Sequence, residues 1–323
     1  MKRTLLAAAV LALGLPHAAI AQAPKFPTKP TRIIVPFVPG GSSDILGRLI
    51  GASLKDAWGT APVVENKPGA SGAIGAEFVA KAGADGHTLL ITDLGTMTIL
   101  PSLAKNLPFD LHRDLAPVTA VSFSPYMAVI TPKHPAKTLK ELVDYSKANP
   151  GKVNFATAGL GSNPHLAGLQ FASAVGIQWV FVPSKGGAQA LQDVAGGHAD
   201  LIFNSTLATA PHVKSGNVRL LAVASPKRSP AYPDAPTIGE TVPGFVAGSW
   251  QGIFTTGGTP REVVARLHAD LVKVLAMPEV REKIHGMGAD PIGNTPEDMD
   301  RSLREERARW AKVIQDNNLK VEQ

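Results

Sequence analysis

The residues best suited to binding chemistry lie where an apolar segment runs into a polar loop that contains adjacent glycines. Residues 33–35 are β-branched and apolar, as in a buried parallel strand. After the loop, which includes Gly40, Gly41 and Ser42, apolar residues recur at helical spacing over 45–58. The first backbone amides of a helix have no intrahelical partner, and the macrodipole is positive at that end. The segment therefore suits an anion, although the same residues could serve only to turn the chain and cap a helix.

A second unit of the same kind follows later in the chain. A strand-like segment at 153–157 leads through a loop with Gly161 and Ser162 into a helix. Strand-like and helix-like segments alternate over 33–224, which is typical of an α/β fold with mostly parallel sheets. Ligands of open α/β sheets bind beyond the carboxyl ends of the strands. If the two units belong to separate lobes, Gly41 and Ser162 should face each other across one cleft.

The composition excludes several classes of function. The chain has 323 residues, of which 44% are hydrophobic and 18% charged, and it has no cysteine. It therefore has no disulfide, no thiol nucleophile and no thiolate metal site. The formal net charge is +6, but lysine and arginine are scattered along the chain, so a nucleic-acid partner is not expected. A mildly positive field favours encounters with anionic solutes.

The first residues predict export from the cytoplasm. Lys2 and Arg3 precede an apolar run at 5–15, and small residues flank a cleavage point at 19–21. This pattern is typical of a secretory signal peptide, here residues 1–21. An uncleaved membrane anchor is the alternative, but the apolar run falls short of the ~20 residues that a spanning helix needs. We therefore expect a protein that is exported from the cytoplasm.

Catalytic motifs are missing from the sequence. The histidines lie far apart, and neither a metal-binding His-Glu-x-x-His nor a Gly-x-Ser-x-Gly nucleophile elbow occurs. Ser162 and His165 could form a nucleophile–base pair, but a helix-capping serine followed by a helix histidine is the commoner arrangement. The sequence favours a binding protein over an enzyme, with no catalytic residue, no cofactor and no metal.

Several runs of residues together resemble one protein family. They are found at 33–41, 65–70, 74–77, 85–90, 158–162, 165–168, 182–186, 233–237 and 243–245. In these runs the chain resembles the solute receptors of tripartite tricarboxylate transporters, the Bug family of periplasmic binding proteins. The resemblance implies an α/β, two-lobed periplasmic binding protein of the type II-like kind, with a ligand cleft between the lobes and a two-strand hinge. Lobe 1 would comprise 22–125 and 246–323, and lobe 2 would comprise 126–245.

The same resemblance implies a function and partners. Such a receptor captures a small carboxylate between its lobes in the periplasm and delivers it to the permease subunits of a tripartite tricarboxylate-type membrane transporter. Closure of the lobes traps the ligand. Two alternatives remain open: a ligand-sensing receptor for a membrane sensor kinase, and a secreted hydrolase. We expect a monomer.

The resemblance also assigns ligand-binding residues. In the first lobe these are Phe37, Pro39, Gly40, Gly41, Ser42, Ser43, Asp44, Gly95, Thr96 and Thr98. In the second lobe they are Gly161, Ser162, Asn163, His165, Ser184 and Asn204. The amides of residues 41–43 should matter more than Asp44, whose charge would repel an acid and which could instead cap the helix. His165 could instead be a packed helix residue.

Two departures from the family pattern bear on the ligand. Asn204 stands where many members have an aspartate, and a neutral amide pairs poorly with a ligand ammonium. Ser184 stands where many members have a tyrosine, which leaves more room. The sequence therefore predicts a carboxylate without an amino group and with space for a bulky or aromatic group.

Overall fold

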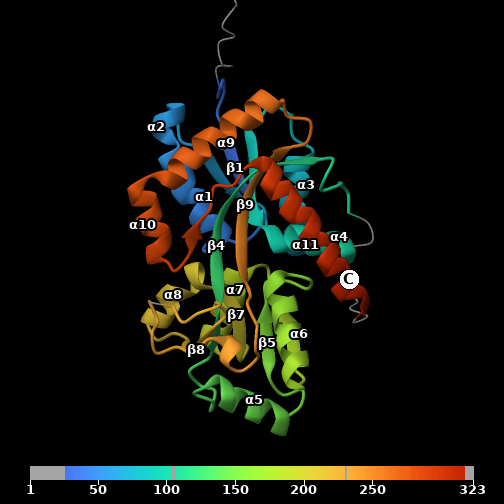
Figure 1. Cartoon of the computed structure of the whole chain (residues 1–323), viewed down its shortest axis with the longest axis vertical. Helices are drawn as coiled ribbons and strands as arrows, with labels where there is room; N and C mark the ends of the chain where they lie inside the picture. Colours follow the sequence, from blue (N-terminus) through green and yellow to red (C-terminus); the bar gives the residue numbers. More distant parts are fainter. Residues whose placement is uncertain (1–25, 104–106, 230, 317–323) are drawn as a thin grey trace, which may run out of the picture.

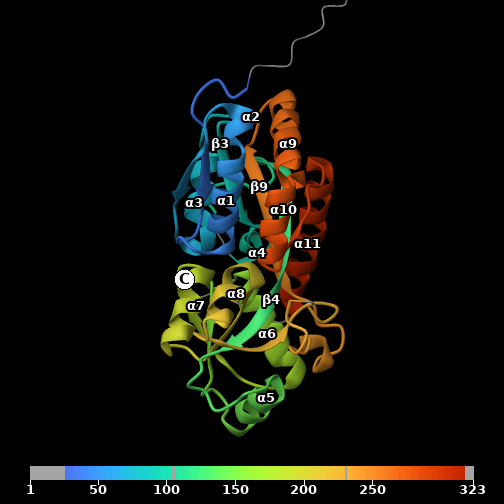
Figure 2. The same cartoon turned by 90° about the vertical axis from the view of Figure 1, so that its left-hand side faces the viewer.

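One long strand, β4 (Leu115–Ile130), runs through the middle of the molecule and belongs to two sheets. The structure, a computed structural model, describes residues 26–103, 107–229 and 231–316. In Figures 1 and 2, β4 joins an upper and a lower α/β lobe. The predicted signal peptide, residues 1–21, lies outside the described residues. No helix within those three ranges combines the length and the apolar character that crossing a bilayer requires.

The upper lobe is built on a mixed sheet. Its strands, in spatial order, are β2 (Val63–Asn66), β1 (Arg32–Val35), β3 (Thr88–Asp93), β9 (Gly248–Thr256) and the first part of β4, to which the short β10 (Asp290–Pro291) also pairs. β1 is parallel to both β2 and β3, whereas β9 is antiparallel to β3 and β4. The parallel strands end at the same edge of the sheet, the edge that faces the lower lobe (Figure 2).

Helices cover both faces of this sheet. They are α1 (Ser42–Ser53), α2 (Lys55–Trp58), the 3₁₀ turn η1 (Ala70–Gly72), α3 (Ala73–Ala80), α4 (Leu94–Leu103), α9 (Arg261–Ala276), α10 (Pro278–Gly286) and α11 (Pro296–Asp316). Because side chains alternate along a strand, Ile33 and Val35 pack with Leu46 in one core. Ile34 points the other way and packs with Ala76 of α3 in a second core.

The lower lobe has its own sheet and an aromatic core. Its strands are β5 (Asn154–Thr157), β6 (Val180–Pro183), β7 (Leu201–Ser205), β8 (Arg219–Val223) and the end of β4, and its helices are α5 (Leu139–Ala148), α6 (Asn163–Val175), α7 (Gly187–Gly196), α8 (Thr206–Lys214) and the 3₁₀ turn η2 (Ile238–Glu240). Phe155 and Phe171 both stack on Trp179 in this core, with ring centroids 5.2 and 5.5 Å apart.

The chain crosses between the sheets twice. β4 pairs with β9 as far as Pro125, opposite Gly248, and from Tyr126 onward it pairs with β7. The chain returns at Ala247, whose carbonyl accepts a 3.0 Å hydrogen bond from the Tyr126 amide. We keep the predicted division into 22–125 with 246–323 and 126–245 as a proposal, and these crossing points support it.

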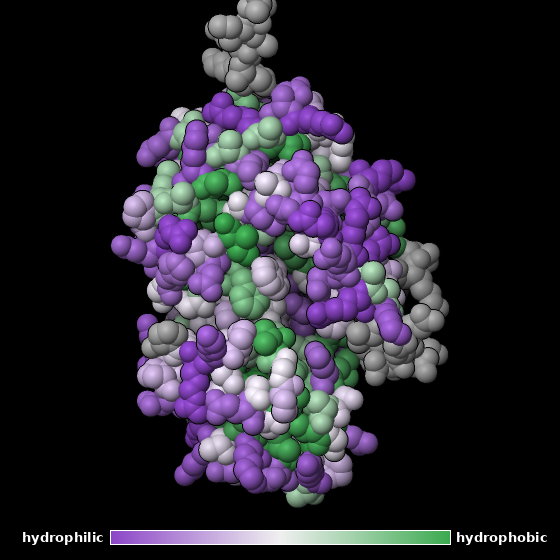
Figure 3. All heavy atoms as spheres, in the orientation of Figure 1, coloured by the Kyte–Doolittle hydropathy of each residue, from purple (hydrophilic) through white to green (hydrophobic). Residues whose placement is uncertain are grey.

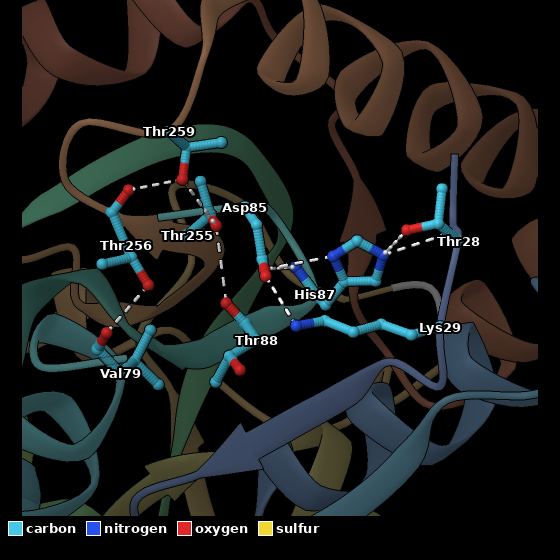
Figure 4. Close-up of polar contacts among 9 residues, drawn as sticks. All are labelled: Thr28, Lys29, Val79, Asp85, His87, Thr88, Thr255, Thr256 and Thr259. Carbon is cyan, nitrogen blue, oxygen red and sulfur yellow. Dashed lines mark hydrogen bonds and ion pairs between the residues drawn. The ribbon is translucent and has the colours of Figure 1, made fainter. Parts of the chain in front are cut away.

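A polar network fixes the first described residues to the upper lobe (Figure 4). The Thr28 amide donates to Nε2 of His87 at 3.1 Å, and the Lys29 ammonium lies 2.7 Å from the Asp85 carboxylate. The His87 amide donates to the same carboxylate at 3.0 Å. Burial opposes charge on Asp85, but the hydrogen bonds from Lys29 and His87 outweigh it and lower the pKa of Asp85 to about 2. These bonds therefore hold the segment before β1 against the upper lobe.

Candidate functional site

A small cavity of about 50 Å³ lies between the two lobes. Its walls come from both sides of the division: Phe37, Val38, Gly41, Ser42, Ser43, Asp93, Ser249 and Gln251 from the upper lobe, and Tyr126, Ala158, Ser162, Pro164, Gly187, Ala188, Asn204, Ser205 and Ala208 from the lower. Gly41 and Ser162 are both among them, so the two loops that the sequence predicts to face each other meet at one cavity. It lies beyond the carboxyl ends of β1, β3, β5 and β7, where ligands of open sheets bind.

Four helices begin at this cavity. α1 starts in the upper lobe, whereas α6, α7 and α8 start in the lower lobe, and residues from the first turn of each line the wall. None of these four helices has a side-chain hydrogen bond at its N-cap. One amide of α8, that of Leu207, donates to the Ser124 hydroxyl at 3.1 Å. The converging positive helix ends and their backbone amides make the cavity favourable for a negatively charged group.

Two buried hydroxyls add further polar groups to the wall. The hydroxyl of Ser162, a residue 1% exposed, has no hydrogen-bond partner. The hydroxyl of Tyr126 makes no hydrogen bond of normal geometry either, although the Asn163 side chain is close enough to lower its pKa. Burial, helped by the charge of Asp93, outweighs that effect and raises the pKa of Tyr126 well above its usual value. A buried hydroxyl without a partner is costly, so a ligand that bonds to Ser162 recovers that cost.

A hydrogen-bonded group on the upper-lobe side contains a carboxylate. The Ser249 hydroxyl donates to Oδ2 of Asp93 at 2.5 Å, and the Gln251 amide donates to the same atom at 3.4 Å. The carbonyl oxygen of that Gln251 amide accepts from Ser43 of α1 at 2.6 Å. Asp93 is 8% exposed, so its side chain is nearly withdrawn from solvent.

Sequence reasoning did not find Asp93, Tyr126, Ser249 or Gln251. One signal was available for Asp93, because it ends the apolar run of β3 and so lies at the carboxyl edge of the sheet. Ser249 and Gln251 are two residues apart on β9 and therefore share a face. That this face borders the cavity depends on how the sheet packs.

The predicted site residues fall into three groups. Those that line the cavity are Phe37, Gly41, Ser42, Ser43, Ser162 and Asn204. Those that line a different hollow, on the opposite face of β9 beside α11, are Gly95, Thr98 and Asn163. Those that line neither are Pro39, Gly40, Asp44, Gly161, His165 and Ser184. The side chain of Thr96 lies outside the described part of the structure.

The second hollow has a volume of about 440 Å³ and is lined by both apolar and polar residues. The ring of Trp250 packs on that of Phe123 at a centroid distance of 4.5 Å and remains half exposed there. Figure 3 shows this face of the molecule, which is hollowed between the lobes. Gly95 and Asn163 meet at its floor, where the Asn163 amide donates to the Gly248 carbonyl at 2.8 Å.

Asp44 stabilises the start of α1. Its carboxylate accepts from the Gly40 amide at 3.0 Å, from Asn66 at 3.0 Å and from the Arg48 guanidinium at 2.8 Å. Burial opposes the charge, but the hydrogen bonds from Arg48, Gly40 and Asn66 outweigh it and lower the pKa of Asp44. Asp44 is the third residue of α1, and the amide it binds belongs to Gly40 before the helix, so it does not cap the helix as the sequence allowed. These contacts hold the loop before α1 and keep the charge of Asp44 away from the cavity.

His165 is a packed residue of α6. Its Nδ1 accepts a 3.0 Å hydrogen bond from the Gly161 amide, and its ring packs edge-on against Phe181. Burial lowers the pKa of His165 to about 4, so the ring is neutral near pH 7. The Ser162 hydroxyl has no partner and so makes no hydrogen bond to this ring. The arrangement needed for a serine nucleophile and its base is not formed here.

Two other predicted side chains are held within the lower lobe. The Ser184 hydroxyl donates to Asp193 at 2.8 Å. The Asn204 amide donates to the Thr209 hydroxyl at 3.1 Å. The Asn204 oxygen lies against Gly187, where an added Cβ would approach it to 2.6 Å. Asn204 therefore presents its side chain to the cavity already oriented by Thr209.

Metal binding has no support in the described residues. Within 26–103, 107–229 and 231–316, no three histidine, aspartate or glutamate side chains gather as a metal site would require. The polar chemistry of the cavity thus consists of helix-start amides, hydroxyls, two amide side chains and one carboxylate.

The sequence matches a family model described as the tripartite tricarboxylate transporter family receptor, over residues 46–319. The chain belongs to this family. The resemblance predicted from the sequence is thereby confirmed, and so is the two-lobed binding-protein fold.

Three solved structures are similar to this receptor. The periplasmic binding protein BugD is 34% identical with a TM-score of 0.87, over 91% of this chain and 99% of that one. Rpa4515 of R. palustris, solved with adipate, is 34% identical with a TM-score of 0.87, over 90% and 98%. MatC of Rhodopseudomonas palustris, with bound malate, is 32% identical with a TM-score of 0.84, over 90% and 100%.

Proposed function

We propose that this protein is a periplasmic receptor that captures a small carboxylate between its two lobes. One observation carries the proposal: four helices from both lobes begin at one cavity without side-chain hydrogen bonds at their N-caps. A carboxylate there accepts hydrogen bonds from backbone amides and meets the positive ends of the helix dipoles. The adipate and malate in the names of two related structures support the same ligand class.

The lobes are in contact across the cleft, as they would be around a trapped ligand. Ser71 of the upper lobe donates to the Leu160 carbonyl of the lower lobe at 3.0 Å. Phe37 lies beside Gly186, where an added Cβ would be 3.3 Å from Cβ of Phe37. A cavity of about 50 Å³ holds only a few water-sized molecules. Ligand must therefore enter while the lobes are apart, and closure around it follows the hinge motion known for binding proteins.

The loaded receptor would deliver its ligand to the permease of a tripartite tricarboxylate-type transporter. Membership of the receptor family supports this partner. A membrane sensor kinase is the second candidate partner, because it would bind the same closed conformation of the receptor. A pull-down with the permease subunits and with the sensor's periplasmic domain, each with and without ligand, separates the two. We further propose that the receptor acts as a monomer and without catalysis.

Thermal unfolding with a panel of carboxylates tests the ligand class. Succinate, malate, adipate, citrate and phthalate should be compared with neutral analogues of the same size, such as hexane-1,6-diol. A ligand that binds only the folded state raises the melting temperature by mass action. We expect at least one carboxylate to do so and to be recovered chemically unchanged. A panel in which no carboxylate shifts the melting temperature at millimolar concentration contradicts the proposal.

The sequence-based preference for a ligand without an amino group stays a proposal of its own. It rests on Asn204, whose amide is oriented toward Thr209. Aspartate and glutamate belong in the panel for that reason. If aspartate or glutamate binds more tightly than succinate, Asn204 does not exclude an amino group, but the proposal of carboxylate binding stands.

A further inference from the structure

The last helix of the chain, α11, runs from the upper lobe to the boundary with the lower one (Figure 1). Its first half belongs to the upper lobe, because Met299 and Leu303 pack in the same core as Leu100 of α4. Its last turns carry Trp310 and Ile314, which are four residues apart and therefore lie on one side of the helix. The apolar side of α11 thus continues beyond the core of its own lobe.

A separate apolar cluster forms where this end of α11 meets the lower lobe. It consists of Trp310, Ile314, Ile99 of α4 and Leu166 of α6, with Leu169 of α6 packed against it. Trp310 is 6% exposed and Leu166 is 2% exposed. Among the described residues, neither leucine belongs to a core of the lower lobe itself. Both leucines therefore pack on apolar side chains of the upper lobe.

The cluster adjoins the candidate binding site. Leu166 lies in the first turn of α6, and its amide donates to the Ser162 carbonyl at 3.1 Å. Ser162 is the N-cap residue of that helix and lines the cavity between the lobes. No described residue of α11 lines this cavity. The last helix therefore contacts the start of α6 without itself reaching the site.

We propose, as an addition that rests on the proposed function, that Trp310 and Ile314 are positioning residues that hold the lobes closed on the ligand. The closed form removes this apolar contact from water, and rotation of one lobe away from the other exposes part of it. The hydrophobic effect then favours closure in proportion to the apolar area buried. Because a ligand between the lobes binds tightly only in the closed form, the contact raises the affinity without touching the ligand.

A purely structural role for Trp310 is the competing explanation. Its ring packs in one cluster with Ile99 of its own lobe, and the Arg309 guanidinium lies 4.8 Å from its ring centroid. Contacts within one lobe stabilise the open and the closed form alike, so they affect the melting temperature and leave the affinity unchanged. The affinity for a carboxylate is therefore the measurement that separates the two roles.

The test is calorimetric titration of the full-length receptor with succinate, malate, adipate, citrate and phthalate. For each acid that the wild type binds, Trp310→Ala should raise Kd by about tenfold or more, because it removes the largest side chain of the cluster. Trp310→Phe keeps an aromatic ring, so its Kd should lie between those of the wild type and Trp310→Ala. Leu303→Ala is the matched control, since Leu303 is a buried residue of the same helix that packs in the upper-lobe core. It should lower the melting temperature and leave Kd unchanged.

A second variant approaches the contact from the lower lobe. Leu169 is only partly buried, so Leu169→Ala should fold, and we expect Kd to rise by about three- to tenfold. In the double variant with Trp310→Ala, the increase should be smaller than the product of the two single increases, because both act on one cluster. An unchanged Kd in the single variants, or a fully multiplicative double variant, would overturn the proposal. If Trp310→Ala does not fold, the Kd of Leu169→Ala decides alone.

The proposed function and this addition fail in different ways. Normal binding by the wild type with unchanged Kd in the variants contradicts only the role of the cluster. A wild type that binds none of the five acids contradicts carboxylate capture, and small-angle scattering of the ligand-free proteins then tests the cluster by itself. A larger radius of gyration in Trp310→Ala than in the wild type supports the role of the cluster, and an equal one overturns it.

Discussion

The hydroxyl of Ser71 donates a hydrogen bond of 3.0 Å to the carbonyl oxygen of Leu160, although these residues belong to different lobes. Ser71 lies in the 3₁₀ turn before α3, with a positive φ of 51°. Leu160 lies in the glycine loop that leads into α6. The bond therefore connects the two sides of the cleft directly, and it can exist only while the lobes are closed.

Replacing Ser71 with alanine should weaken ligand binding. The closed form would lose one hydrogen bond, which contributes about 0.5–1.5 kcal/mol, so we expect Kd to rise by about two- to tenfold. Calorimetry with the best ligand of the carboxylate panel measures this. Ser173→Ala, on an exposed position of α6, is the matched control. An unchanged Kd would show that the contact between Ser71 and Leu160 does not stabilise closure.

Replacing Gly95 with alanine should hold the lobes apart. A Cβ at Gly95 would lie 2.6 Å from Nδ2 of Asn163 on the other lobe, and that amide is bound to the Gly248 carbonyl. Overpacking costs typically about 1–3 kcal/mol, and opening the cleft avoids it, so we expect Kd to rise by about tenfold or more.

Small-angle scattering is the direct measurement for Gly95→Ala. The variant should keep a larger radius of gyration than the wild type when ligand is added. Gly286→Ala is the control, because an added Cβ there meets nothing within 4 Å. If Gly95→Ala compacts on ligand addition as the wild type does, the added methyl group does not hold the lobes apart.

Replacing Ser162 with alanine should affect binding more than stability. Its buried hydroxyl has no partner, so its removal should leave the melting temperature of the ligand-free protein unchanged or slightly higher. If the hydroxyl donates to the ligand carboxylate, its loss should raise Kd by about 10- to 100-fold, as for hydrogen bonds to charged groups. A lowered melting temperature with normal binding would instead assign Ser162 to the fold.

His165 should make the protein less stable as the pH falls. Burial lowers the pKa of His165 to about 4, from about 6.5 in the unfolded chain. The native state favours the neutral ring, so the contribution is complete above pH 6.5 and declines as the pH falls from 6.5 toward 4. Linkage gives a loss on the order of 2 kcal/mol between pH 8 and pH 5 from this residue.

Denaturant unfolding at several pH values checks the prediction for His165. The variant His165→Asn retains an acceptor for the Gly161 amide but cannot titrate, so its stability should fall less over this range. His198→Gln, at an exposed position, should follow the wild type. Identical pH profiles for the wild type and His165→Asn would show that the ring is not desolvated.

Much of the architecture can be predicted from local patterns in the sequence. The β-branched run 33–35 and the helical spacing after residue 42 correspond to β1 and α1, because strand and helix periodicity depend on neighbours in the chain. The glycine loops before α1 and α6 could be identified as helix starts for the same reason, whereas the absence of side-chain caps at both starts was visible only in the structure. The segments that resemble the receptor family added the prediction of two lobes with a ligand cleft between them.

Other features depend on contacts that no local pattern specifies. Asp44 and His165 belong to the predicted loops, yet Arg48, Asn66 and Phe181 hold them away from the cavity. Ser249 and Gln251 reach the cavity because β9 returns from the lower lobe to pair with both β3 and β4. Pairing between distant strands decides which face of a strand meets a ligand.

The sequence by itself determined the family and the positions of β1, α1 and the start of α6, since strand and helix periodicity and backbone chemistry are short-range properties, but it did not reveal β9, α4 or the first part of β4. The tertiary structure alone decided that Asp93 shares the cavity with the two helix starts and that Ser71 meets Leu160. Those contacts join residues from separate strands and lobes, and their positions are fixed only when sheet pairing and lobe closure bring the segments together.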